Sequence, residues 1–526
     1  MVHSLIYFIK FAFLYTLRNM QADNRNQRIA RNTLMLYIRM FALLLVGLYT
    51  SRVVLEALGE NDYGIYNVVG GVVAMFTMIS GALNSAVSRF ITFEMGKGDG
   101  NHLRQVYSTA VIIQFILAVI VVVIAEPVGL WFINNEMTID PSRIPAARWV
   151  LHFSLFSFVI NLMSVPQMAS ITAHERMSAY AAIGILDSLL RLSVAFLIMK
   201  NPVDRLVYYA ALMSVTVLIV RTAYGFYCRR HFPECRFSPV CDGSLIKEMF
   251  SFAGWNFIGV SAGVLRDQGG NILVNLFYGT AVNAARGVAV QLNSAIQGFV
   301  SNFMTAVNPQ ITKSYAGGDL KYMFSLVRRS SRMSFCLLLV IALPVLFNTE
   351  YILSLWLKDV PAHTALFVRL FLVFALCESL SGPLVTAQLA TGRIRNYQIV
   401  VGGLMLLNIP VSYILLRLGA MAEITVVVAI VLSLLCLVAR LVMLQKMIGL
   451  PVGRFLTDVC LRSAVVAAAS VVLPAVLTLT DVDGFAGFAL SVTVCVTCTA
   501  FSSLYIGMSG EERKGLLSML KKGGTE

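Results

Sequence analysis

The sequence has little charge and few groups that carry out chemistry. Only 13% of its 526 residues are charged, against roughly a quarter in soluble domains. The six histidines are dispersed and none has a partner at ligand spacing, so we assign no catalytic residue and predict no enzyme. No Walker A motif or other Gly-rich nucleotide loop is found, which excludes ATP hydrolysis by these residues. No zinc-finger spacing or compact basic domain accompanies the net charge of +14, so we expect no nucleic-acid partner.

The nine cysteines do not form the framework of a secreted disulfide protein. Six of them lie in or beside apolar runs, where cysteine behaves as a small hydrophobe. The other three, Cys228, Cys235 and Cys241, cluster with His231 in one loop. Their spacing is not a recognised zinc pattern, and we therefore expect neither a metal nor another cofactor.

Long apolar runs are abundant instead. Hydrophobic residues make up 58% of the chain, its mean hydropathy is +0.78, and runs of roughly 20 apolar residues are long enough to cross a bilayer. The fold class is therefore all-α, a polytopic membrane protein. We predict fourteen transmembrane helices, at residues 33–56, 65–88, 108–133, 149–172, 179–199, 206–227, 249–267, 285–308, 332–357, 365–390, 397–416, 423–445, 462–480 and 485–507.

The orientation follows from the basic residues of alternate loops. The loops on the side of both termini hold 27 Lys and Arg, and the opposite loops hold 6. Positive charge collects on the cytoplasmic side, so both termini are predicted to be cytoplasmic. The apolar run at residues 4–17 is too short to span and is expected at the interface, or else translation starts at Met20 rather than Met1.

An internal repeat is visible at a nearly constant offset. A shift of 220 pairs Gly59 with Gly279 and Asp99 with Asp319; a shift of 217 pairs a Ser-x-Pro and an Arg-x-x-x-Tyr in each half. Six spans per half imply parallel repeats, a transporter architecture. The predicted domains are residues 1–31 (a cytoplasmic or interfacial segment), 32–228 (first six-helix bundle), 229–248 (cytoplasmic loop), 249–445 (second bundle) and 446–526 (two additional helices and a cytoplasmic tail).

Charges inside the predicted spans are the candidate functional residues, because charges at membrane depth usually line a polar interior. Arg39, Arg52 and Arg89 lie in or at the end of the first two spans, and Arg266 and Arg286 lie in their repeat-mates. Guanidinium groups bind phosphate bidentately, so we predict a cationic cavity for an anion. Snorkelling to headgroups is the alternative for Arg52 and Arg89.

Amides and acids extend this list. Asn271, Asn275 and Gln291 are predicted to bind the polar body of a substrate, with interhelical hydrogen bonding as the alternative. Asp267, Glu378 and Asp187 are candidates for a coupling-ion site, driven by a Na⁺ or H⁺ gradient. Asp187 also stands four residues before Arg191, a spacing that favours a structural ion pair along one helix face.

The opening stretch resembles a known family. Asn32-Thr33, Ser51-Arg52-Val53, Leu58-Gly59, Asp62-Tyr63-Gly64-Ile65-Tyr66, Arg89-Phe90 and Glu94-Met95-Gly96 are similar to the start of Wzx-type polysaccharide flippases, in the multidrug/oligosaccharidyl-lipid/polysaccharide (MOP) superfamily. The resemblance implies a MATE-like pair of six-helix bundles in a V, in the bacterial cytoplasmic membrane. It also implies movement of undecaprenyl-pyrophosphate-linked oligosaccharide between leaflets, with arginines around the pyrophosphate.

Three functions are weighed on these residues. The first is a lipid-linked oligosaccharide flippase in O-antigen, capsule or exopolysaccharide synthesis, whose partners are its substrate, membrane lipids, and a polysaccharide polymerase with its assembly proteins. The second is a multidrug exporter coupled to Na⁺ or H⁺, whose cavity would need acids and aromatic rings for organic cations. The third, a membrane-embedded transferase, lacks an outer loop that could hold a catalytic acid or base.

Overall fold

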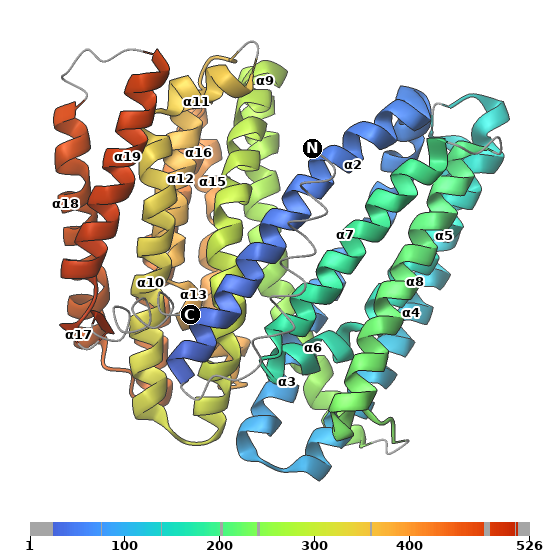
Figure 1. Cartoon of the computed structure of the whole chain (residues 1–526), viewed down its shortest axis with the longest axis horizontal. Coiled ribbons are helices and arrows are strands. Elements are labelled where there is room, and N and C mark those ends of the chain that lie inside the picture. Colours follow the sequence, from blue (N-terminus) through green and yellow to red (C-terminus); the bar gives the residue numbers. More distant parts are fainter. Residues whose placement is uncertain are drawn as a thin grey trace, which may run out of the picture. The chain divides into compact units, whose positions relative to one another are not determined.

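The computed structural model is built of helices joined by short connections (Figure 1). It describes residues 25–74, 76–137, 139–199, 204–238, 242–357, 360–477, 484–510 and 512–513. Residues 1–24, which are most of the predicted segment 1–31 and include both candidate start sites, and most of the C-terminal tail lie outside these residues. The chain divides into two compact units, Met1–Phe257 and Ile258–Glu526.

The first unit contains α2 (Arg25–Ala74), α3 (Thr77–Lys97), α4 (Gly100–Asn135), η1 (Pro141–Arg143), α5 (Ile144–Met163), α6 (Val165–Ala173), α7 (Met177–Met199), α8 (Arg205–His231), η2 (Pro233–Cys235) and the start of α9 (Gly243–Ala316). Helix α2 packs on α7 and α5, and α5 packs on α4 and α8. A buried apolar cluster of this unit joins the second arm of α2 to α4, α5 and α8.

The second unit contains the rest of α9, then α10 (Leu320–Phe347), α11 (Thr349–Trp356), α12 (Thr364–Ser379), α13 (Gly382–Ala390), α14 (Arg395–Leu406), α15 (Asn408–Arg417) and α16 (Ile424–Ile448). Helix α17 (Val452–Phe455), the wider turn η3 (Leu456–Leu461), α18 (Arg462–Leu477), α19 (Gly484–Ser502) and η4 (Ser503–Gly507) follow. Helix α10 packs on α12, α13, α18 and α19, and α16 packs on α12, α14 and α15.

The repeat predicted from the sequence is confirmed at the level of backbone conformation. Gly59 (φ 76°) and Gly279 (φ 78°) each interrupt a long helix, α2 and α9, with the same non-helical geometry. Asp99 and Asp319 each cap the following helix by accepting backbone N–H bonds. Residues 164 and 380–381 break the fourth helix of each half just before a proline, and the short helices that follow end at Ala173 and Ala390.

The predicted spans differ from the observed helices at two places. They leave residues 57–64 and 268–284 as connections, but both stretches are helical apart from the single kinks at Gly59 and Gly279. A glycine at φ > 0 can redirect the chain in one residue because it has no Cβ to clash. Ten helices in the described part of the chain are long and apolar enough to cross a membrane. Helices α2, α3 and α9, which carry the predicted arginines, are not among them.

Candidate functional site

Arg39 lies on the first arm of α2 and is held against α7. Its guanidinium carbon is 4.4 Å from the centroid of the Tyr180 ring, and its side chain covers Gly184, where a Cβ would lie 2.3 Å from the Arg39 Nε. That Nε is buried and has no hydrogen-bond partner among the described residues. The absence of a side chain at Gly184 therefore makes room for a cation inside the first unit.

Two further predicted arginines belong to the same unit. Arg89 on α3 is buried, 9% exposed, and its guanidinium carbon lies 4.4 Å from the Phe93 ring and 5.6 Å from the Phe252 ring. Aromatic faces attract a cation electrostatically and shield it from apolar surroundings. Arg52 lies on α2, but its side chain is outside the described residues, so its predicted role stays a prediction.

In the second unit, Arg286 is held by the other arm of α9. Its guanidinium is 4% exposed, donates to the Asn271 side-chain oxygen, and donates to the Asp267 carbonyl at 3.2 Å. The Phe371 ring of α12 lies 5.3 Å away. All its described hydrogen-bond acceptors are neutral oxygens.

Arg266 and Asp267 complete this group. The Arg266 Nε donates to the Asp267 carboxylate at 2.9 Å, and the Phe374 ring lies 4.8 Å from its guanidinium carbon. The Asp267 side chain is 61% exposed. Arg266, Asp267, Asn271 and Arg286 thus form one cluster with two cations and one anion, which we call the α9 cluster.

The other predicted amides lie on exposed faces of α9 rather than in this cluster. Asn275 precedes the kink and Gln291 follows it, and both are exposed, as is Gln268. Gln268 accepts a hydrogen bond from Asn271 at 3.0 Å. Exposed amides are expensive against lipid, so this arrangement indicates that part of α9 faces water.

The candidate coupling acids have different surroundings. Asp187 accepts a hydrogen bond from the Arg191 Nε at 3.0 Å on α7, the helical ion pair that the spacing favours. Glu378, at the end of α12, accepts a hydrogen bond from the Ser433 hydroxyl of α16. Its Coulombic contacts include Arg440, which is 2% exposed.

Sequence reasoning missed Arg440 and its counterpart Arg221. Arg440 on α16 is hydrogen-bonded to Tyr397 and is attracted electrostatically by Glu378. Arg221 on α8 donates to the Asn161 side chain at 2.8 Å. Arg440 and Arg221 occupy nearly equivalent positions of the repeat, as do Glu378 and Asn161, so each unit carries an arginine opposite a polar side chain at the break of its fourth helix. The signal that could have identified them is the repeat itself, which places an arginine at nearly the same position in both halves.

The loop with the three cysteines contains two contacts. Cys228 and Cys235 lie against each other and are both buried, whereas Cys241 is outside the described residues. Beside them, Glu234 is hydrogen-bonded to the His174 ring, which stacks on Phe232 with centroids 3.9 Å apart. Burial, the largest single effect, raises the pKa of the Glu234 carboxyl, but the hydrogen bond and charge of His174 together with a backbone N–H bond outweigh it, and the net pKa lies below its ordinary value.

Comparison with known families shows the family to which the chain belongs. A family model described as polysaccharide biosynthesis protein matches residues 29–315, more than half of the chain. The chain belongs to this polysaccharide biosynthesis protein family. The matched residues run from α2 to the end of α9, so they include all five predicted arginines and exclude Glu378 and Arg440.

The chain is similar to the uncharacterized membrane protein EpsK of Bacillus subtilis (strain 168). It is 19% identical over 297 residues, which cover 56% of this chain and 58% of EpsK. The chain therefore matches less than two thirds of that relative's length. The resemblance of the opening stretch to polysaccharide flippases agrees with membership of this family.

The fold of the family member is that of MATE transporters. An outward-facing multidrug resistance MATE family transporter of the MOP superfamily superposes with a TM-score of 0.70 at 13% identity, covering 82% of this chain and 97% of that one. A MOP superfamily transporter from Pyrococcus furiosus superposes at 0.69 with 11% identity, covering 81% and 99%. These likenesses confirm the predicted all-α, MATE-like class. The chain is a multi-pass membrane protein with a MOP-type fold.

Proposed function

We propose that this protein is a flippase that moves an oligosaccharide linked to undecaprenyl pyrophosphate across the bacterial cytoplasmic membrane. The observation that carries the proposal is the α9 cluster, in which Arg266 and Arg286 outnumber Asp267 and the acceptors of Arg286 are neutral. An excess cation at membrane depth is costly unless an anion or water compensates it. A pyrophosphate supplies that anion and matches the guanidinium fork.

The remaining groups suit the rest of such a substrate. Exposed Asn275 and Gln291 on α9 offer donors and acceptors for sugar hydroxyls, while the prenyl chain stays in lipid. Arg39 and Arg89 supply cations from the first unit, with Arg52 as a further candidate. Alternating access of the two units then carries the headgroup to the other leaflet.

Coupling to a cation gradient is the second part of the proposal. Glu378 is the strongest candidate for the coupling carboxyl, because among the described residues it forms no salt bridge and accepts a side-chain hydrogen bond from the neutral Ser433 hydroxyl. Protonation would remove the negative charge opposite Arg440 and change the local packing between α12 and α16. Asp187 and Asp267 are weaker candidates, since each already pairs with an arginine on its own helix.

A cation-coupled multidrug exporter is the alternative, and it shares the MATE-like fold. A cavity for organic cations requires acids and free aromatic faces. Here the rings of Phe371 and Phe374 already lie over Arg286 and Arg266. This occupancy favours an anionic substrate. We further propose cytoplasmic termini, and a polysaccharide polymerase with its assembly proteins as partners.

The test is leaflet exposure of the lipid-linked glycan in cells lacking the protein. These cells are complemented with wild type, Arg286→Gln, Arg39→Gln or the control Arg369→Gln. Arg369 is also a membrane arginine, but it is exposed and pairs with Glu350 at 3.2 Å. We expect the first two variants to leave the glycan on the cytoplasmic side at normal protein levels, and the control to restore export.

Two results would contradict the proposal. Export unaffected by loss of the protein, together with new sensitivity to cationic drugs, would favour the multidrug exporter. Equal rescue by all three variants would instead remove the arginines from the substrate site. Dependence on the proton gradient is tested separately with Glu378→Gln, which is expected to export at a rate that no longer changes when the gradient is collapsed.

A further inference from the structure

The outer surface of the first unit carries a second site, a groove between α4, α8 and the loop that follows α8. Its volume is about 770 Å³, and its lining includes Tyr107, Phe115, Gln167, Phe226, Arg229 and Phe237. Ligand pockets commonly have roughly 300–1,000 Å³. We call it the α4–α8 groove.

The groove is built by the cysteine-containing loop, which folds back on the start of α4. The Arg104 Nε donates to the Arg236 carbonyl at 3.0 Å, and the Ser238 backbone N–H donates to the Ser108 hydroxyl at 3.0 Å. Cys235 lies against Tyr107 from the same side. These contacts fix one end of the groove and place Phe237 in its wall.

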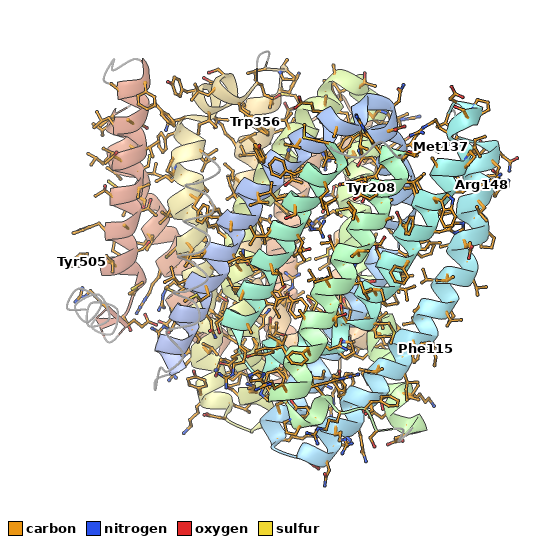
Figure 2. All side chains as sticks on the ribbon, turned by 45° about the vertical axis from the view of Figure 1, so that its right-hand side comes forward. Phe115, Met137, Arg148, Tyr208, Trp356 and Tyr505 are labelled. Carbon is orange, nitrogen blue, oxygen red and sulfur yellow. The ribbon has the colours of Figure 1, made fainter. Side chains whose placement is uncertain are left out.

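The walls are apolar and open outward. Phe115 on α4 is 59% exposed and Phe226 on α8 is 67% exposed, and Figure 2 shows Phe115 at the margin of the ribbon. Between them, Gly225 leaves open space, because a Cβ there would meet no atom within 4 Å. From Tyr107 to Phe115 the groove follows eight residues of α4, about 12 Å at the helical rise.

The end of the groove next to the cysteine-containing loop is cationic. Arg229 lines the groove, and Arg104, Arg230 and Arg236 are exposed nearby on the same loop and helix ends. No Asp or Glu lines the groove. The loop's own acid, Glu234, is engaged by His174. Nothing in the lining therefore neutralises Arg229, and an anionic group at that end is electrostatically complementary.

We propose that the α4–α8 groove binds an anionic phospholipid of the cytoplasmic leaflet. One acyl chain lies along Phe115 and Phe226 over Gly225, and the lipid phosphate pairs with Arg229. The predicted orientation places this end of α8 on the cytoplasmic side, where anionic lipids attract basic residues. The site is on the outside of the first unit, and it does not depend on the proposed flippase activity.

The groove fits a phospholipid better than the prenyl pyrophosphate substrate. A single guanidinium lines it, which suits one phosphate diester. The two-arginine α9 cluster is the better match for a pyrophosphate. A soluble anion would not account for the exposed phenyl rings, whereas a lipid uses both ends of the site.

The experiment uses the purified full-length chain in phosphatidylcholine nanodiscs with a few mole per cent of phosphatidylglycerol carrying a photoreactive acyl chain. Crosslinks are mapped by mass spectrometry. We expect labelling on α4 and α8 around Phe115 and Phe226. It should fall at least threefold in Arg229→Gln and in Gly225→Leu, which fills the groove. Arg230→Gln removes the same charge one residue away, outside the lining, and is expected to label like wild type.

Three results would overturn the proposal. Equal labelling by a photoreactive phosphatidylcholine with the same chain would mean that the headgroup is not recognised. Equal loss in Arg229→Gln and Arg230→Gln would mean that only total charge matters. Displacement of the probe by equimolar polyprenyl phosphate, but not by unlabelled phosphatidylglycerol, would assign the groove to the prenyl substrate. Size-exclusion profiles matching wild type establish that the variants are folded.

Discussion

The kink of α9 at Gly279 gives a stability prediction whose sign and size come directly from its backbone geometry. Gly279 has φ 78° and ψ −174°, a region that is essentially restricted to glycine. A residue with a Cβ there costs about 1–3 kcal/mol. A Cβ at this position would meet no atom within 4 Å, so backbone strain is the whole penalty of Gly279→Ala.

Gly287 is the matched control on the second arm of the same helix. It is helical and exposed, and a Cβ there would also meet no atom within 4 Å. Replacing glycine by alanine in a helix interior stabilises by roughly 0.5–1 kcal/mol. The two substitutions add the same methyl group, yet their unfolding free energies are expected to differ by about 1.5–4 kcal/mol.

The assay is reversible unfolding of the purified protein by sodium dodecyl sulfate in mixed micelles, followed by intrinsic tryptophan fluorescence. We expect Gly279→Ala to unfold at lower denaturant fraction than wild type and Gly287→Ala to unfold at a higher one. Gly59→Ala, at the equivalent kink of α2, is expected to follow Gly279→Ala. Identical midpoints for Gly279→Ala and Gly287→Ala would refute the assignment of strain to the kink.

Three further predictions concern other contacts. The pKa of Glu234 is lowered by its histidine partner against the opposing effect of burial, so its stabilisation is full above pH 4.5, its ordinary value, and is lost as the pH falls below it; Glu234→Gln should flatten this acid limb in a pH series of unfolding midpoints. The pKa of Glu512 is also lowered, despite burial, by the Ser509 N–H and by Arg332; Glu512→Gln should make the segment after α19 cleave faster in limited proteolysis, and an unchanged rate would show that the ion pair does not hold it. In Gly184→Ala the new Cβ would lie 2.3 Å from the Arg39 Nε, so the unfolding free energy should fall by roughly 1–3 kcal/mol.

The sequence was informative wherever a feature depends on local chemistry. The kinks at Gly59 and Gly279 and the caps at Asp99 and Asp319 were found as repeat pairs before their geometry was known, because only particular residue types perform these tasks. The ion pair of Asp187 with Arg191 followed from helical spacing alone.

Features that depend on tertiary environment were not predictable in the same way. The predicted spans end at residue 267 and resume at residue 285, but residues 268–284 are helical except at Gly279. Hydropathy reports which residues leave water and does not report backbone conformation. The partners of Arg286 could not be predicted either, because Asn271 reaches Arg286 only when α9 folds back on itself at the kink.

The two halves of the repeat differ in which helix contacts carry a charged side chain. In the first unit, the Arg39 side chain of α2 covers Gly184 of α7. In the second unit, the residue equivalent to Arg39 is Gly259 of α9, and the Gln398 side chain of α14 covers it. The same close helix contact is thus filled from opposite sides, as dense packing requires. Only the first unit keeps a charge at this contact.

At the break of the fourth helix it is the second unit that carries the additional charged side chain. Arg221 donates to the neutral Asn161 in the first unit, whereas the residue equivalent to Asn161 in the second unit is the acid Glu378, which attracts Arg440 electrostatically. A neutral amide has no charge to change, whereas a carboxyl is a group that a proton or a cation can bind. The equivalent position thus holds a titratable side chain in the second unit and a neutral one in the first, so the coupling role proposed for Glu378 has no counterpart at Asn161. The asymmetry predicts that Glu378→Gln makes the second unit resemble the first at this point, which is why its effect on gradient dependence, rather than on substrate binding, is the informative readout.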